Sequence, residues 1–136
     1  MYESQSQIEP KPLNILVVED DETDAYLIHR ALTFCPRAAS ITFAGDGIAA
    51  LSALDRMGSS PDLALIDLHM PRMNGYRLVA ELVAREGAKF PLVVLTSAKE
   101  NNDVMRSVVK DATRVITKPV ALTELTETLK PLIAAL

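Results

Sequence analysis

Short apolar runs alternate with helix-period segments along most of this chain, and no other feature limits its possible folds as strongly. The runs are largely apolar at consecutive positions, as in strands covered on both faces; they span residues 13–18, 41–44, 63–66, 92–95 and 115–116. Apolar stripes at helical spacing follow each run: Ala25, Ile28, Ala31, Leu32; Ile48, Leu51, Leu54; Leu78, Val79, Leu82, Val83; Val104, Met105, Val108; Leu122, Leu125, Leu129, Leu132. Five strands alternating with five helices predict an α/β domain with a doubly wound parallel sheet and right-handed crossovers.

The length of 136 residues is that of one domain. The first residues are polar, and Pro10 and Pro12 separate them from the first apolar run. We therefore predict a flexible N-terminal arm over residues 1–12 and one domain over residues 13–136. Pro131 falls inside the last apolar stripe, which predicts that the last helix kinks or ends early there.

The composition excludes several classes of function. A net charge of −4, the absence of Trp and only 4% aromatic residues argue against nucleic-acid binding. No apolar run approaches the roughly 18 residues of a membrane span, and no secretory signal is visible. The lone Cys35 excludes an internal disulfide and is expected to pack as a small hydrophobe near a helix end. These features predict a cytoplasmic protein.

Carboxylates follow two of the predicted strands at the point where each ends. Glu19 and Asp20 come directly after the first run, and Asp67 ends the third. In a doubly wound sheet these two strands are neighbours at the switch point, so we expect the three carboxylates to converge there. Such oxygen ligands suit Mg²⁺. Of the next acidic residues, Asp21 or Glu22 is expected to cap the first helix instead.

The fourth and fifth predicted strands end on residues that complement this acidic edge. Thr96 and Ser97 bring a hydroxyl to the edge, either of them also able to cap a helix. Lys118 emerges from the fifth strand, where its charge would offset that of a phosphoryl group. Together with Asp67, these residue types predict phosphoryl chemistry.

In these residues the chain resembles the response-regulator receiver domains of two-component signalling. Glu19-Asp20 is similar to the family's acidic pair, with Glu at the first position. The stretch from Asp67 to Gly75, with Pro71 between them, resembles the phosphoacceptor loop. Lys118-Pro119 resembles a Lys-Pro pair whose peptide bond is cis in the family. The resemblance implies a flavodoxin-like (βα)5 fold with strand order 2-1-3-4-5.

The resemblance also implies a role for each residue. Asp67 would accept a phosphoryl group from a histidine kinase or a histidine phosphotransfer protein, and Lys118 would neutralise its charge. Mg²⁺ would be bound directly by Asp20, Asp67 and the backbone carbonyl of His69, and Glu19 would hold it through water. Thr96 would be the switch hydroxyl, chosen by its spacing from Lys118, with Ser97 as the fallback. The protein would be a signalling phosphoacceptor and not a conventional enzyme.

The predicted output surface departs from the family pattern at three positions. The position of the usual aromatic switch residue is Val115, the residue after the Lys-Pro pair is Val120, and the Gly-Ala turn before the fifth strand reads Asp111-Ala112. The chain is expected to be a stand-alone receiver, with a weaker resemblance to regulators that pair with phytochrome-like kinases. A homodimer through the fourth and fifth predicted helices is a hypothesis, and the downstream partner is open.

Three other functions compete with this interpretation. An Asp-dependent phosphatase of the haloacid-dehalogenase type would need a second Asp at position 69 and a cap domain, but position 69 is His. A flavodoxin-like cofactor binder would need a Ser/Thr/Gly-rich phosphate loop where Glu19–Glu22 stand. A pseudo-receiver that only binds other proteins would not need the complete set of Asp20, Asp67, Thr96 and Lys118.

Overall fold

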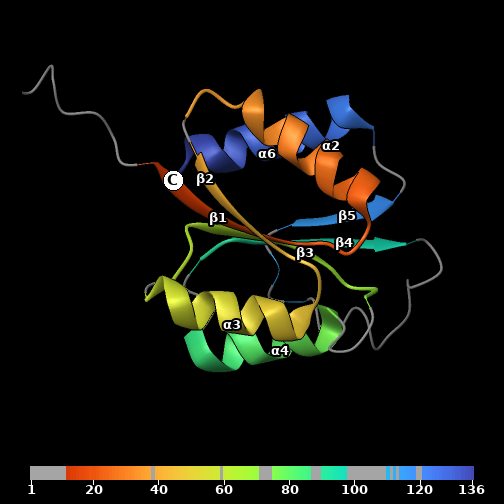
Figure 1. Ribbon diagram of the computed structural model, residues 1–136. Coiled ribbons are helices and arrows are strands. Elements are labelled where there is room, and N and C mark those ends of the chain that lie inside the picture. The colour runs from red at the N-terminus through yellow and green to blue at the C-terminus, as the bar shows by residue number, and fades with distance from the viewer. Residues whose placement is uncertain are drawn as a thin grey trace, which may run out of the picture.

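Five parallel strands form the centre of the protein (Figure 1). The computed structural model describes residues 12–37, 39–58, 60–70, 75–86, 90–97, 110, 112, 114–118 and 121–136. The strands are β1 (Leu13–Val18), β2 (Ala39–Ala44), β3 (Leu63–Asp67), β4 (Leu92–Ser97) and β5 (Arg114–Lys118). Their order is β2-β1-β3-β4-β5, and every pair is parallel, so the predicted fold is confirmed.

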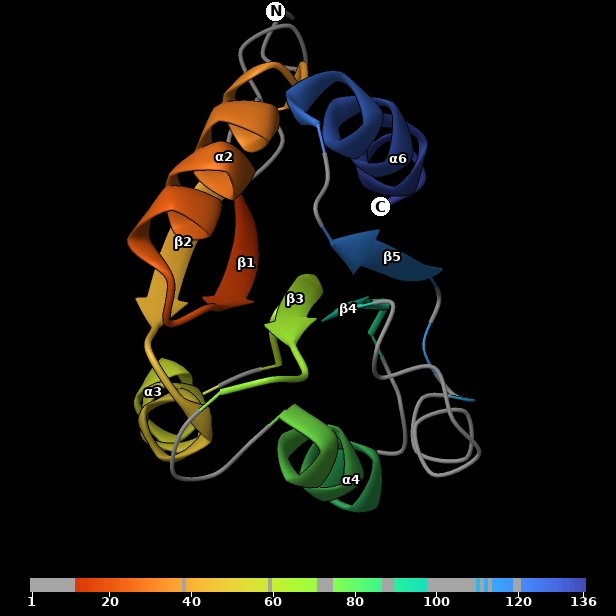
Figure 2. The same cartoon turned by 90° about the vertical axis from the view of Figure 1, so that its right-hand side faces the viewer.

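Helices cover both faces of the sheet. Within the described residues they are α2 (Glu22–Thr33), α3 (Gly47–Met57), α4 (Gly75–Glu86) and α6 (Leu122–Ala134). Helices α2 and α6 lie on one face, and α3 and α4 lie on the other (Figures 1 and 2). The helix predicted around Val104, Met105 and Val108 lies outside the described residues. So does the predicted arm, except for Pro12.

The two helical layers explain why the strands are apolar at consecutive positions. Alternate residues of β1 enter different cores: Leu16 and Val18 pack on the α3 and α4 side, and Ile15 and Val17 pack on the α2 and α6 side. All four are fully buried. Burying both faces of a strand in this way is the usual situation in a parallel sheet.

Most strands extend beyond the apolar runs that predicted them. For example, β4 continues through Ser97 and β5 through Lys118, and these two residues are paired in the sheet. The predicted runs were too short because polar residues end these strands, whereas the backbone pairing does not depend on side-chain polarity.

The helix ends test two of the predictions. Asp21 is the N-cap of α2, where its side chain accepts a hydrogen bond from the backbone N–H of Asp24 at 2.8 Å. The expected capping role of Asp21 is thus confirmed. By contrast, α6 passes through Pro131 to Ala134, so an early end at Pro131 is wrong. The proline removes one hydrogen bond, but Leu129 and Ile133 on either side of it are buried in the core and keep the last turn in place. The alternative prediction, a kink, is untested.

Cys35 lies just after α2 and is buried in the core on that side of the sheet. Its Sγ atom donates to the carbonyl of Ala31 at 3.5 Å. Burial raises the pKa of the thiol, so it stays protonated at neutral pH. The expected role as a small hydrophobe is confirmed. None of the helices in the described part of the chain is long and apolar enough to cross a membrane.

Candidate phosphoacceptor and metal site

The carboxyl ends of β1, β3 and β5 meet at the right-hand edge of the sheet in Figure 1. Glu19 follows β1, Asp67 is the last residue of β3, and Lys118 is the last residue of β5. The three side chains come together there, as the sequence predicted, because parallel strands deliver their carboxyl ends to one edge.

Lys118 is the centre of this site. Its ammonium Nζ donates to Glu19 Oε1 at 2.9 Å, to Asp24 Oδ2 at 2.9 Å and to Asp67 Oδ2 at 3.2 Å. A lysine ammonium has three N–H donors, and this arrangement uses all of them. Two of the acceptors were predicted to lie here, whereas Asp24 was not. Its only sequence signal is an acidic side chain in the first turn of a helix, and that pattern is equally typical of capping.

Asp67 is a buried carboxylate whose two oxygens have different partners. Only 3% of the residue is exposed. Oδ1 accepts from the backbone N–H of His69 at 3.0 Å, and Oδ2 accepts from Lys118. The chain after Asp67 is held in turn, because Leu68 donates its N–H to the Leu95 carbonyl and accepts from the N–H of Gly75. The carboxylate is therefore held in one orientation.

Three carboxylates offer ligands for a cation. One oxygen each from Glu19, Asp20 and Asp67 can be chosen so that all lie within 4.8 Å of one another. Glu19 and Asp67 are buried, whereas Asp20 is exposed, so one side of the cluster is open to solvent. An all-oxygen set with few protein ligands and access for water fits Mg²⁺. The His69 carbonyl, also predicted as a ligand, stays a prediction.

Burial shifts the pKa values of Glu19 and Lys118, and the charge of each residue opposes the shift that burial causes in the other. Burial, together with the hydrogen bond and charge of Asp67, raises the pKa of Glu19 to about 8, although Lys118 opposes the rise. Burial lowers the pKa of Lys118, but the hydrogen bonds that Lys118 donates to Asp24 and Glu19, with the charges of Glu19 and Asp67, more than offset this and raise that pKa. Lys118 thus stays charged, whereas its charge offsets only part of the rise in the pKa of Glu19.

The raised pKa of Glu19 predicts an unusual pH dependence for the metal-free protein. The folded state keeps the Glu19 proton up to about pH 8, whereas the unfolded chain releases it near 4.5. The stabilisation from this group is therefore fully present below 4.5 and is lost as the pH rises towards 8. We expect Mg²⁺, which requires the carboxylate, to raise the melting temperature more at pH 8 than at about pH 6. Melting curves with EDTA and with saturating Mg²⁺ measure this.

The control for this prediction is Glu19→Gln, which has nearly the same shape and cannot titrate. In EDTA, the melting temperature of this variant should fall less than that of the wild type as the pH rises towards 8. Equal pH dependence in the variant and the wild type would show that Glu19 does not cause it.

The two candidate switch hydroxyls differ in what the structure describes. Thr96 is 3% exposed and follows Leu95, which is the sheet partner of Asp67. The Ser97 side chain lies outside the described residues, so the choice of Thr96 stays a prediction. Val115, at the predicted aromatic position, is 45% exposed on β5. The other predicted departures, Val120 and Asp111, and the predicted cis bond before Pro119 lie outside the described residues.

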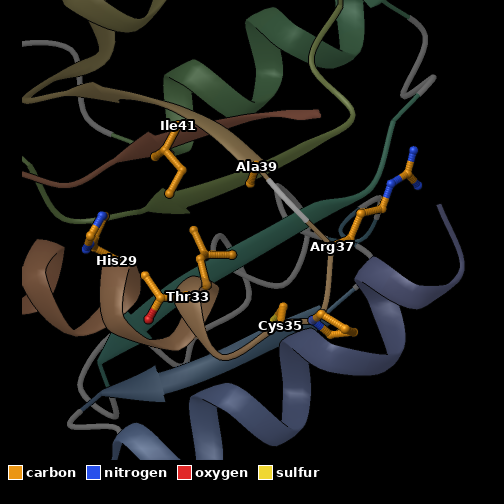
Figure 3. Close-up of a pocket in the computed structure, with 8 residues that line it drawn as sticks. His29, Thr33, Cys35, Arg37, Ala39 and Ile41 are labelled. Carbon is orange, nitrogen blue, oxygen red and sulfur yellow. The ribbon is translucent and has the colours of Figure 1, made fainter. Parts of the chain in front are cut away.

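A hollow of about 360 Å³ lies away from this site (Figure 3). Its lining includes His29 and Thr33 of α2, Cys35 just after that helix, and Ala39 and Ile41 of β2. Ala39 is the first residue of β2, so the hollow is at the edge of the sheet opposite the acidic cluster. It contributes nothing to the geometry around Asp67.

Comparisons with known proteins agree with this geometry. The family model of the response regulator receiver domain matches residues 15–130. The sensor histidine kinase CheAY of Helicobacter pylori is 32% identical over 130 residues, which cover 93% of this chain and 16% of CheAY. The response regulator Rcp1 of Synechocystis is 32% identical over 102 residues, which cover 71% of this chain and 69% of Rcp1. The chain thus spans a small part of CheAY and about two thirds of Rcp1.

Solved structures extend the similarity to three dimensions. The phosphorylated cyanobacterial phytochrome response regulator RcpA aligns with a TM-score of 0.78 at 26% identity, covering 93% of this chain and 97% of the other. The Mn²⁺-bound form of Rcp1 aligns with a TM-score of 0.73 at 28% identity, covering 88% and 91%.

Proposed function

The chain belongs to the response-regulator receiver family of two-component signalling, and on this basis we propose that it accepts a phosphoryl group on Asp67 and thereby switches the binding of a partner protein. The observation that carries the proposal is the state of Asp67, a buried carboxylate held by one backbone N–H and one ammonium beside a cluster of cation ligands. A purely structural aspartate would not need all three.

The transfer itself is a displacement at phosphorus. The Asp67 carboxylate attacks the phosphorus of a phosphohistidine, an O–P bond forms, and the P–N bond breaks with its electron pair passing to the imidazole, which takes up a proton. Asp67 thereby loses its negative charge and gains a phosphoryl group with about two. Lys118, already within hydrogen-bonding distance of Asp67, donates to the phosphoryl oxygens and offsets part of that charge.

Glu19, Asp20, Asp67 and the His69 carbonyl are the proposed ligands of Mg²⁺. The bound cation would neutralise charge on the phosphoryl oxygens. Burial of Glu19 supports this assignment, because its carboxylate is held where a cation would relieve its raised pKa. The Mn²⁺-bound form of Rcp1 supports a divalent cation in this family.

We propose Thr96 as the group that reports the phosphoryl group to the surface. Its hydroxyl is buried one residue beyond the sheet partner of Asp67, so a short movement would bring it towards the phosphoryl group. Val115 cannot make the rotation of an aromatic ring, so the change passes to the surface without one.

Receiver domains take their phosphoryl groups from histidine kinases or phosphotransfer proteins. The similarity to RcpA makes a phytochrome-type kinase a candidate for the cognate donor. A homodimer through α6 and the helix predicted around residues 104–108 stays a proposal. Size-exclusion chromatography with light scattering, with and without a phosphoryl mimic, tests it, and a monomer under both conditions would rule it out.

The decisive experiment is the intact mass of the protein after incubation with acetyl phosphate, with and without Mg²⁺. We expect the wild type to gain one phosphoryl group only with Mg²⁺, and Asp67→Asn to gain none. Asp55→Asn is the matched control, because Asp55 is an exposed carboxylate paired with Arg85 at 3.3 Å on the outside of the helical layer. It should behave as the wild type. No mass gain under any condition would favour the pseudo-receiver.

A further inference from the structure

Asp24 is the acceptor of Lys118 that lies outside the cation cluster. We propose that Asp24 is a positioning residue that restrains Lys118 and so limits how tightly the site holds a phosphoryl group. The proposal rests on the function proposed above for Asp67 and Lys118. Asp24 would thus help to set the affinity of the site for a phosphoryl group.

The restraint of Lys118 follows from its hydrogen bonds. All three donors of the ammonium are used, so a donor can turn to a phosphoryl oxygen only if one present bond breaks. The bond to Asp24 is 2.9 Å long, against 3.2 Å for the bond to Asp67. In the form described, Lys118 lies closer to the carboxylate that must release it than to the phosphoacceptor.

A bound cation would not relieve this competition. Glu19 and Asp67 both belong to the acidic cluster, so a cation there would take over part of their charge. Asp24 is not a member of that cluster, so a cation held there would not be bound by its carboxylate. It would therefore remain a competitor of the phosphoryl oxygens for Lys118, while the other two acceptors would be partly neutralised.

The surroundings of Asp24 hold its carboxylate in place. Its backbone N–H is bound to the Asp21 cap, which fixes the first turn of α2. A small cavity lined by Leu27, Ile28, Leu95 and Leu125 adjoins the Asp24–Lys118 pair. These apolar walls reduce solvent screening on one side of the pair, although the Asp24 side chain is still 33% exposed.

Removing the Asp24 charge should therefore strengthen phosphoryl binding. Asp24→Asn keeps the size of the side chain but weakens its hold on Lys118, which leaves an ammonium donor available to the incoming anion. We expect beryllofluoride, a mimic of the phosphoryl group, to bind about three- to tenfold more tightly in the presence of Mg²⁺. Fluorine NMR titration of the full chain measures the affinity without any phosphoryl transfer.

Glu22→Gln is the matched control for this change. Glu22 is the other acidic residue in the first turn of α2, so its removal has the same effect on the helix dipole. No contact between Glu22 and Lys118 is among those described, and we expect its loss to leave beryllofluoride affinity unchanged. A second test adds Asp24→Asn to the Lys118→Gln variant. If Asp24 acts by restraining Lys118, this addition should not change the affinity for beryllofluoride.

The outcomes separate this inference from the proposed function. If the wild type gains phosphoryl mass but Asp24→Asn binds beryllofluoride equally or more weakly, the restraint is wrong and the function stands. An Asp24 effect that persists without Lys118, or that Glu22→Gln reproduces, also overturns the restraint. If the wild type takes up neither acetyl phosphate nor beryllofluoride, the proposed function fails and the restraint fails with it.

Discussion

Gly75→Ala is expected to lower the free energy of unfolding by about 3 kcal/mol or more and the melting temperature by roughly 10 °C. A Cβ atom at this position would overlap the carbonyl oxygen of Asp67 and the Cα of Leu68. These are backbone atoms of the buried Asp67 and its neighbour, so they cannot move aside as a flexible side chain can. Thermal or urea unfolding followed by circular dichroism measures the loss, and phosphoryl uptake should fall with it.

Gly45→Ala is the matched control. A Cβ at Gly45 would meet nothing within 4 Å, and its backbone does not require glycine. We expect this variant to change stability by less than about 0.5 kcal/mol. If the two substitutions destabilise the protein equally, close packing of Gly75 against the end of β3 is not the cause.

Lys118→Gln should slow phosphoryl uptake but strengthen the binding of Mg²⁺. Losing the ammonium removes the proposed donor to the phosphoryl oxygens, so the rate of phosphoryl uptake should fall at least about 100-fold. The same loss leaves the carboxylates of Glu19, Asp24 and Asp67 without the ammonium that they share. The affinity of the site for Mg²⁺ should therefore rise by about three- to tenfold. Intact-mass kinetics measure the first effect and calorimetric titration the second.

Lys130→Gln removes an equal charge from α6 at a position away from the acidic cluster, where Lys130 lines a separate surface hollow. It should change neither quantity measurably, because an exposed charge at that distance is largely screened. Parallel losses of Mg²⁺ affinity and phosphoryl uptake in Lys118→Gln would contradict the opposed effects and indicate a damaged fold instead.

Local pattern was enough to predict the architecture and most of the site. The apolar runs identified the strands because both faces of the sheet are buried, and the residues that end these runs identified Glu19, Asp67 and Lys118. The same patterns failed where local preference and tertiary packing differ. Pro131 does not end α6, because buried residues on both sides of it hold the last turn.

The sequence by itself determined the order of strands and helices, and hence which residues would stand at the carboxyl edge of the sheet. That information is local, since side-chain period and the residue after each run can be read along the chain. Only the tertiary structure decided that Asp24 pairs with Lys118, 94 positions away, and that Gly75 lies against the backbone of Asp67. These contacts depend on how α2 and α4 sit on the sheet, and that placement is set by the packing of two cores rather than by any local pattern.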